Sequence, residues 1–300
     1  MMKQNKKKGM PVKPNTLFEV KEQIELMSFL IDSLTGKSRQ NVKRLLTNKQ
    51  VEVNGQQRSQ YNYLLHQGDK VKIKWMRQQE VKSFNGFSIV FEDEYLIVID
   101  KHSGVLSVAT NDERNYTAYN FLSIHVKREH PANKIFIVHR LDRETSGLMI
   151  YAKSAEVQHK LQDNWKELIT ERSYVAVTEG VFNEKRGVVS SYLHENAAHV
   201  VYSDQNPLGG KKAITHYEVL KSNRNYSLLA VKLETGRKNQ IRVHMQDIGH
   251  SIINDKKYGS TVNPIDRLGL HSRILAFIHP VTGQSLRFTT PIPRKFMRLF

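Results

Sequence analysis

The strongest constraint on the fold is the prevalence of short, β-branched apolar runs after residue 86. These runs predict strands at residues 89–91, 95–99, 135–138, 148–152, 174–177 and 228–233. Two helical stripes are clear: Val157, Leu161 and Trp165 after a capping Ser154, and Ile241, Met245 and Ile248 before Gly249. Because strands outnumber helices and are not separated by long crossover helices, we expect an α+β fold with a mixed, largely antiparallel sheet.

A smaller unit precedes this region, at residues 16–76. A stripe of Leu26, Phe29, Leu30 and Leu34 predicts a helix that ends at Gly36. A basic helix follows at 37–49 with Ser38 as its N-cap, and strands are expected at 51–55, running into an Asn54-Gly55 turn, and at 71–75. Residues 77–86 are polar and aperiodic, which predicts a linker. The 300 residues are therefore expected to hold two domains, at 16–76 and 87–300.

The charge balance points to a polyanionic partner. Lys and Arg number 46 against 29 Asp and Glu, a formal net charge of +17 at pH 7. Five lysines and no acid lie within residues 1–13, which predicts a flexible basic arm over residues 1–15. The predicted basic helix is the sharper cluster, and its candidate phosphate contacts are Lys37, Arg39, Lys43 and Arg44.

Composition and missing motifs exclude several classes of protein. The absence of cysteine removes disulfides, a thiolate nucleophile and Cys-based zinc sites. No apolar run reaches the ~18 residues of a membrane helix, and no secretory signal follows the basic N-terminus. Phosphate-cradling loops, a Gly-x-Gly-x-x-Gly fingerprint, His-Glu-x-x-His and Gly-x-Ser-x-Gly are also missing. We therefore expect a soluble, cytoplasmic protein that uses no cofactor and no metal.

The segment richest in reactive side chains is His139-Arg140-Leu141-Asp142-Arg143, followed by Glu144-Thr145-Ser146-Gly147-Leu148. It lies between two predicted strands, so it forms an ordered turn on a rigid platform. Nearby arginines favour the ionised form of Asp142, and this carboxylate could act as a nucleophile or stabilise a cationic centre. A salt-bridged turn without chemistry is the alternative at this point.

The whole string closely resembles the signature of the RluA-type RNA pseudouridine synthases. Further blocks support the resemblance, from about residue 87 to the C-terminus: 100–108, 172–176, 235–244, Gly249-His250, Asp255, Tyr258-Gly259, 270–271 and 279–280. His102, Asn239, Ser251 and Asn254 depart from the usual family pattern. The first unit resembles the S4 RNA-binding domain through Ser38-Arg39, the turn at 51–55 and Gly68-Asp69.

This resemblance implies the fold of the synthase domain and the roles of its site residues. Asp142 corresponds to the family's catalytic aspartate, Tyr174 to its active-site tyrosine, and Arg242 to the arginine that faces the aspartate. Arg140 is expected to fill the space of the flipped base or to clamp a phosphate. His139, Arg237 and Gln240 are the further substrate contacts that we expect. Whether Asp142 adds covalently or supports a cationic glycosyl state stays open.

The implied reaction isomerises uridine in RNA to pseudouridine. Large-subunit ribosomal RNA is the favoured substrate because of the S4-like unit, and transfer RNA is the alternative. Two other functions are weighed: a non-catalytic RNA-binding or ribosome-assembly factor, which has no need of a carboxylate beside phosphates, and an RNA methyltransferase, which would need a Gly-rich donor loop. We expect a monomer that binds RNA and no membrane.

Overall fold

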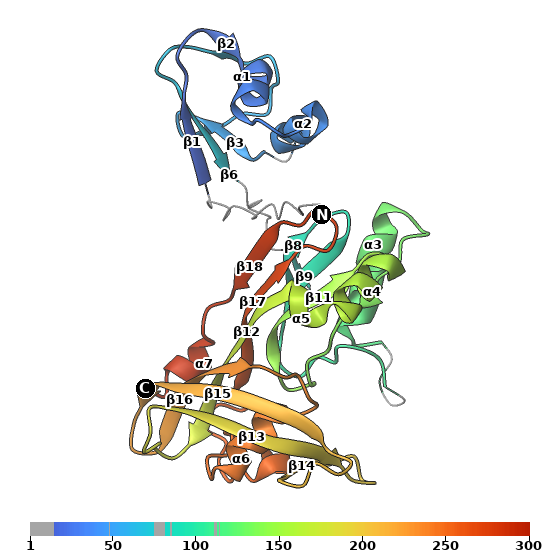
Figure 1. Cartoon of the computed structure of the whole chain (residues 1–300), viewed down its shortest axis with the longest axis vertical. Helices are drawn as coiled ribbons and strands as arrows, with labels where there is room; N and C mark the ends of the chain where they lie inside the picture. Colours follow the sequence, from blue (N-terminus) through green and yellow to red (C-terminus); the bar gives the residue numbers. More distant parts are fainter. Residues whose placement is uncertain (1–14, 48, 75–81, 85, 111–112, 114) are drawn as a thin grey trace, which may run out of the picture. The chain divides into compact units, whose positions relative to one another are not determined.

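A computed structural model describes residues 15–47, 49–74, 82–84, 86–110, 113 and 115–300. The chain divides into two compact units, Met1–Glu80 and Val81–Phe300 (Figure 1). The predicted basic arm falls outside the described residues except for Asn15. Most of the predicted linker is outside them as well, and its residues 82–84 form a strand that the sequence pattern did not indicate.

The first unit packs two helices against small antiparallel sheets. One sheet has the order β1-β6-β3-β4, and β2 pairs with β5. The elements are β1 (Asn15–Glu19), β2 (Ile24–Glu25), α1 (Leu26–Ser33), α2 (Arg39–Thr47), β3 (Val51–Val53), β4 (Gln56–Gln57), β5 (Leu64–Leu65) and β6 (Lys70–Lys74). Both predicted helices are confirmed.

Helix α2 is amphipathic, as its sequence predicts. The backbone N–H of Asn41 donates to Ser38 Oγ over 3.3 Å, which confirms Ser38 as the N-cap. Val42, Leu45 and Leu46 are buried in the core of the first unit, whereas the cations of α2 are exposed. Burial of the apolar stripe therefore fixes the direction in which the basic face points.

A 12-stranded sheet dominates the second unit, with the order β14-β13-β15-β16-β12-β17-β11-β9-β8-β7, while β10 pairs with β11 and β18 with β17. Its strands are β7 (Lys82–Phe84), β8 (Phe87–Glu92), β9 (Leu96–Lys101), β10 (Phe136–Ile137), β11 (Ser146–Ala152), β12 (Ile169–Glu179), β13 (Arg186–Glu195), β14 (Val201–Asp204), β15 (Lys211–Ser222), β16 (Tyr226–Leu233), β17 (Leu270–Ile278) and β18 (Ser285–Thr289). Among the strand pairs of the described chain, β11 and β17 run parallel and the others antiparallel. The expected mixed, largely antiparallel sheet is confirmed.

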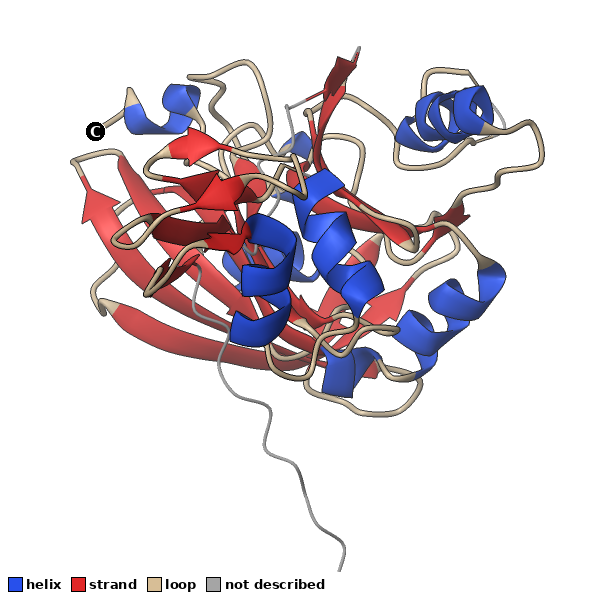
Figure 2. Ribbon diagram, turned by 90° about the horizontal axis from the view of Figure 1, so that it is seen from above, coloured by secondary structure: helices blue, strands red, loops and turns tan. Residues whose placement is uncertain are grey.

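The β-branched runs predict neither β13 to β15 nor β17 and β18. The pattern of β13 and β15 is weak because one face is exposed and carries polar or charged residues such as Ser190, His216 and Glu218. These strands are held by pairing along the whole of β15 rather than by two buried faces. The long, curved strands are visible in Figure 2.

The helices of the second unit cover different parts of the sheet (Figure 1). They are α3 (Ala118–Glu129), α4 (Ala155–Asp163), α5 (Trp165–Leu168), α6 (Gln240–Asp247) and α7 (Arg294–Met297), with a 3-10 turn at Lys256–Tyr258. Helix α4 packs on β10 and β11, α5 on β12, and α6 on β13, β14 and β15. The predicted stripe through Trp165 is broken at Asn164, which separates α4 from α5.

One glycine shows how closely the central strands approach. Gly147 has a φ of +116°, and a Cβ atom built on it would lie 2.2 Å from the carbonyl oxygen of Ser272 on β17. A side chain at this position would therefore push β11 and β17 apart. This is the physical reason for glycine just after the Asp142 turn.

Candidate active site

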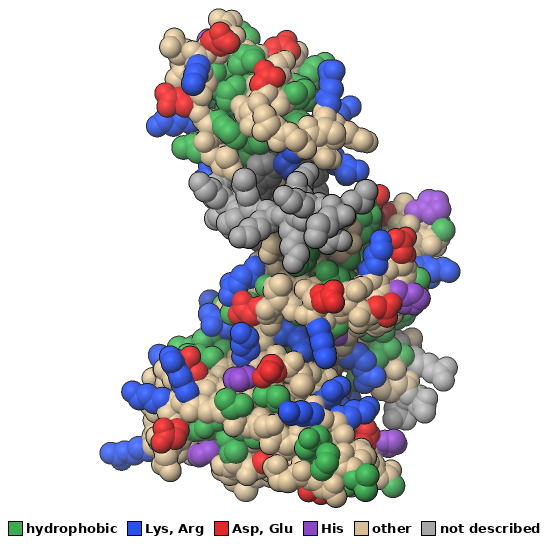
Figure 3. All heavy atoms as spheres, viewed as in Figure 1, with side chains coloured by type: hydrophobic (Ala, Val, Ile, Leu, Met, Phe, Trp, Pro, Cys, Tyr) green, Lys and Arg blue, Asp and Glu red, His purple; other side chains and the backbone are tan. Residues whose placement is uncertain are grey.

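A pocket of about 980 Å³ opens in the second unit where the Asp142 turn, the α4–α5 junction, β12 and residues 233–242 meet. Lys and Arg side chains gather on this face of the second unit (Figure 3). The pocket-lining cations are Arg140, Lys166, Arg172, Arg237, Lys238 and Arg242. Asp142 and Tyr174 line the same pocket, so the structure brings the three predicted catalytic residues together.

The backbone carbonyls of the turn that carries Asp142 accept hydrogen bonds from residues 101–104. The N–H of Gly104 donates to the carbonyl of Arg143 over 2.9 Å, and Ser103 Oγ donates to the carbonyl of Glu144 over 2.7 Å. Lys101 is fully buried, and its Nζ donates to three carbonyls, at Val105, Arg143 and His102 over 2.7, 3.0 and 3.1 Å. Burial lowers the pKa of Lys101 to about 7. The carboxylate is thus carried by a rigid turn.

Arg242, on α6, contacts two carboxylates at once. Its Nη1 donates to Asp142 Oδ2 over 3.2 Å. Its Nε and Nη2 donate to Oδ2 and Oδ1 of Asp255, each over 2.7 Å. The side chain of Asp255 is 1% exposed and that of Asp142 is 37% exposed. The buried pair therefore orients the guanidinium, and the exposed carboxylate faces the pocket.

Two further groups hold the guanidinium of Arg242. Asn239 Oδ1 accepts from Nη1 over 2.9 Å, while Asn239 Nδ2 donates to the hydroxyl of Tyr258 over 2.9 Å. The ring of Tyr258 lies under the guanidinium, with its centroid 4.7 Å from Cζ. Asn239 adopts a φ of 54°, in the left-handed region that asparagine tolerates. Burial opposes the charge, but the Asp255 and Asp142 contacts raise the pKa of Arg242.

Tyr174 lies in the middle of β12, 8% exposed and opposite Ser272 of β17. The pairing with β17 shifts register between Ser173 and Tyr174. Such an irregularity re-aims side chains and is frequent beside active sites. Burial raises the pKa of the Tyr174 phenol, with a smaller contribution from Asp142, so the phenol stays protonated at neutral pH.

The predicted substrate contacts lie differently in the pocket. Arg140 is exposed at its wall, and Arg237 lies at the wall with its Nε donating to the carbonyl of Lys212 over 3.1 Å. His139 accepts the N–H of Ile150 at Nε2 over 3.1 Å, and burial lowers its pKa to about 3. Its ring also packs on Trp165. The neutral imidazole therefore ties the turn to β11 in addition to lining the pocket.

Gln240, also predicted as a substrate contact, lines the pocket but is held by hydrogen bonds within the protein. Its side chain is buried, 2% exposed, and its polar atoms are used within the protein. Oε1 accepts from Thr235 Oγ1 and the N–H of Arg237, and Nε2 donates to Thr215 Oγ1 and the carbonyl of Ile214. Gln240 fixes the loop before α6 to β15 and has no free group for a direct substrate contact.

The remaining predicted substrate contacts belong to the first unit. Lys37 precedes α2, and Arg39, Lys43 and Arg44 lie on α2, all of them exposed. Within the first unit they form an exposed basic face.

Some pocket residues carry no predicted role. Arg172 and Trp165 line the pocket, and Asp255 anchors Arg242. Arg172 precedes Tyr174 by two positions on a strand, and this spacing places side chains on one face. The alternation could have indicated Arg172 from the sequence, whereas the role of Asp255 depends on folding of the loop after α6.

Within the described ranges, no group of three or more His, Asp or Glu side chains is arranged to hold a metal ion. No helix in the described part of the chain is long and apolar enough to cross a membrane.

Comparisons with known proteins give a consistent result. The family model described as RNA pseudouridylate synthase matches residues 95–247. An uncharacterised RNA pseudouridine synthase of Bacillus subtilis, YjbO, is 32% identical over 266 residues, which cover 86% of this chain and 93% of YjbO. Ribosomal large subunit pseudouridine synthase D of Haemophilus influenzae is 36% identical over 227 residues, which cover 71% and 69% of the two chains. The solved structure of human RNA pseudouridylate synthase domain containing 4 shares the fold, with a TM-score of 0.58 and 24% identity over 70% of this chain and 90% of that chain.

Proposed function

This chain belongs to the RNA pseudouridylate synthase family, and from that membership we propose that it modifies large-subunit ribosomal RNA with Asp142 as its catalytic residue. The protein is an RNA pseudouridine synthase, an isomerase that modifies RNA. The alternatives of a purely RNA-binding factor and of a methyltransferase are therefore set aside. The proposal covers the substrate, the role of Asp142 and the role of the first unit.

The observation that carries the role of Asp142 is its contact with Arg242 at the wall of the pocket. The reaction breaks the N1–C1′ bond of uridine, joins C5 to C1′, and exchanges the C5 proton for one on N1. Arg242 donates to Oδ2 of Asp142. The other oxygen, Oδ1, accepts no hydrogen bond from the described residues. The free oxygen can add to the sugar or stabilise a cationic glycosyl state.

Tyr174 and Arg140 complete the proposed reaction. The ring of Tyr174 packs against the uracil while the base turns, and its protonated phenol hydrogen-bonds the base as protons move between N1 and C5. Arg140 is exposed beside the turn and fills the space that the flipped nucleotide leaves in the RNA.

The first unit is proposed to be an S4 domain that binds RNA through its backbone. The observation that supports this role is the amphipathic helix α2. Its apolar stripe is buried in the core of the unit, and its cations lie on the exposed face. The substrate follows from two features: this basic unit, and the printed name of the Haemophilus influenzae relative, ribosomal large subunit pseudouridine synthase D. Transfer RNA is the alternative substrate.

The test is pseudouridine mapping of ribosomal and transfer RNA after incubation with the protein and with Asp142→Ala. New pseudouridine in large-subunit RNA from the intact protein alone is the expected result. Pseudouridine in transfer RNA alone would overturn the substrate, and modification by the Asp142→Ala variant would overturn the catalytic role.

A further inference from the structure

Arg172 is an unusual cation in the pocket because it is partly buried and has no hydrogen-bond or ion-pair partner among the described residues. Arg140 and Lys166 also lack such partners there, but they are exposed, so water hydrates their charges. Lys238 pairs with Glu195, and Arg242 with Asp142 and Asp255. A half-buried guanidinium that lines the pocket and has no anionic partner among the described residues is placed to bind an anion that arrives with the substrate.

Two neighbours prepare the guanidinium of Arg172. Its Cζ lies 5.4 Å from the centroid of the Trp165 ring. This cation–π contact restrains the planar guanidinium without using any of its N–H donors. A Cβ atom at Gly236 would lie 2.7 Å from Arg172 Nη1, so the absence of a side chain at Gly236 leaves room for the guanidinium. The donors are therefore positioned and remain available.

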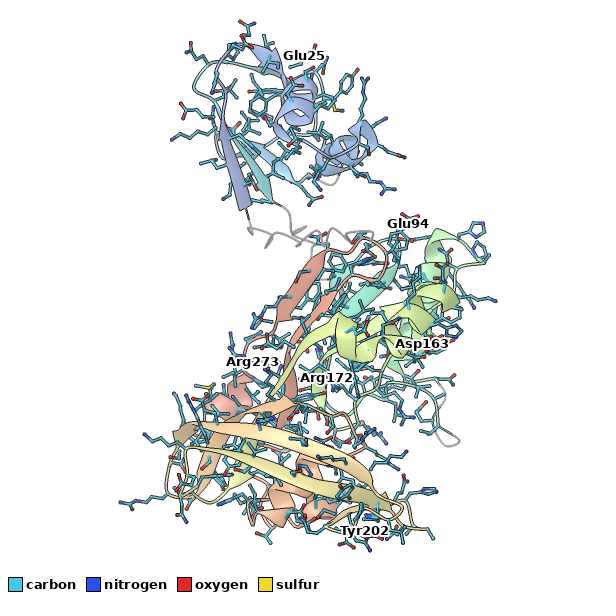
Figure 4. All side chains as sticks on the ribbon, in the orientation of Figure 1. Glu25, Glu94, Asp163, Arg172, Tyr202 and Arg273 are labelled. Atoms are coloured by element: carbon cyan, nitrogen blue, oxygen red, sulfur yellow. The ribbon has the colours of Figure 1, made fainter. Side chains whose placement is uncertain are left out.

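The position of Arg172 relative to Tyr174 indicates which anion it meets. The two residues are two positions apart on β12, about 6.5 Å along a strand, and both line the pocket. This spacing suits a nucleotide whose base lies against Tyr174 and whose phosphate lies beside Arg172. A planar guanidinium with free donors binds a phosphate through two parallel hydrogen bonds. Figure 4 labels Arg172 on β12.

We propose that Arg172, restrained by Trp165, clamps the phosphodiester next to the uridine that is being isomerised. This inference rests on the proposed function, because it places the reacting uridine against Tyr174 and Asp142. It adds a phosphate subsite inside the pocket of the second unit. Its role is to hold the flipped nucleotide at the catalytic carboxylate.

The experiment compares Arg172→Gln with Arg287→Gln in the full chain. Arg287 is the matched control, since it has the same charge but is paired with Glu171 over 3.0 Å and does not line the pocket. The measurement is kcat/KM on transcribed large-subunit ribosomal RNA as a function of salt. We expect Arg172→Gln to lower kcat/KM by about tenfold and to reduce the slope of its logarithm against log salt by about 0.7–0.9, the effect of one lost phosphate contact. Arg287→Gln should match the wild type in both.

Two further variants separate a clamp from a packing role. Arg172→Lys keeps the charge without the fork, so it should retain the salt slope and recover part of kcat/KM. Gly236→Ala keeps the arginine but displaces its guanidinium, so it should reproduce part of the Arg172→Gln defect. An unchanged salt slope in Arg172→Gln, or an equal loss in Arg287→Gln, would overturn the clamp.

Failure of the proposed substrate is distinguishable from failure of the clamp. If wild-type protein forms no pseudouridine in large-subunit RNA, the same variants are compared for binding to oligouridylate in an Asp142→Asn background. If the slope of log binding constant against log salt is reduced in Arg172→Gln but not in Arg287→Gln, the clamp is supported while the substrate proposal is wrong. Equal slopes overturn the clamp on that RNA.

Discussion

The basic face of α2 and the Arg242 centre, which we define as Arg242 with Asp142, Asp255 and Asn239, both contain positive charge. They differ in the burial and the pairing of that charge. Arg39 and Lys43 on α2 are exposed, and no carboxylate of the described residues pairs with them. The side chain of Arg242 is 13% exposed and contacts two carboxylates and an asparagine. Exposed cations exchange counterions for phosphates and need no fixed geometry, whereas a buried, paired guanidinium sets a position and contributes little net charge. The first arrangement suits affinity for many phosphates, and the second suits chemistry at one atom.

The sharpest test of this contrast removes the reacting carboxylate. Asp142→Asn should lower kcat by about a thousandfold or more, because among the described residues Asp142 is the carboxylate that contacts Arg242 at the pocket. RNA affinity should be retained, since the change removes a negative charge from a basic pocket. Single-turnover assays and binding measurements on the same RNA check both statements. A variant that binds RNA much more weakly would show that the Arg242 centre also contributes to affinity.

Removal of the buried partner of Arg242 should have the next largest effect. In Asp255→Asn the guanidinium loses its charged anchor and turns toward Asp142, so kcat should fall by about 10–100-fold with little change in KM. The fall in kcat caused by Asp255→Asn should be much smaller in an Arg242→Lys background, because lysine cannot bridge the two carboxylates. Steady-state kinetics of the double-mutant cycle test this coupling. Additive effects in the cycle would mean that Asp255 acts through folding rather than through Arg242.

Acid should destabilise the second unit before the first. His271 is 4% exposed, its Nδ1 and Nε2 contact Ser146 and Thr290 over 2.7 and 2.8 Å, and burial lowers its pKa to about 3. Between pH 6.5 and about 3 the unfolded chain binds a proton that the folded chain excludes, so the free energy of unfolding falls as the pH falls. His66, the single histidine before residue 81, is exposed.

Substitution of this histidine gives the measurement. In His271→Asn, the free energy of unfolding of the second unit should lose up to about 1.4 kcal/mol per pH unit of its acid dependence. Denaturant titrations at several pH values measure that slope. His199→Asn is the control, since the side chain of His199 is 83% exposed. Identical slopes in His271→Asn and the wild type would rule out this histidine as a source of acid sensitivity.

The smallest effect is expected on the basic face of the first unit. Replacement of both Arg39 and Lys43 by glutamine should raise KM by about 5–10-fold and leave kcat unchanged, because exposed cations proposed to bind RNA phosphates add affinity without taking part in the chemistry. Steady-state kinetics at several salt concentrations measure this, with Lys21→Gln, an exposed cation of the same unit outside α2, as the control. A fall in kcat at saturating RNA would contradict the division of roles.

The sequence predicts the site better than the sheet that carries it. Asp142, Tyr174 and Arg242 could be identified because short blocks of the sequence resemble those of the synthase family and follow one another in the same order. The structure brings the three residues to one pocket. Strands such as β13 and β15 escape a pattern based on apolar runs, since their stability depends on pairing between distant segments and on one exposed face. The buried state of Gln240 was missed for the same reason, because it depends on β15 lying beside the loop before α6.

The position of β17 has a consequence for the synthesis of the chain. This strand spans Leu270–Ile278, yet it lies between β12 and β11 in the sheet. Strand β12 carries Tyr174, and β11 begins just after the turn that carries Asp142. Until β17 emerges from the ribosome, the strand that pairs with both β11 and β12 is missing, and pairing between such distant segments forms slowly. We therefore expect the pocket around Asp142 and Tyr174 to form only after Leu270–Ile278 has been synthesised and paired.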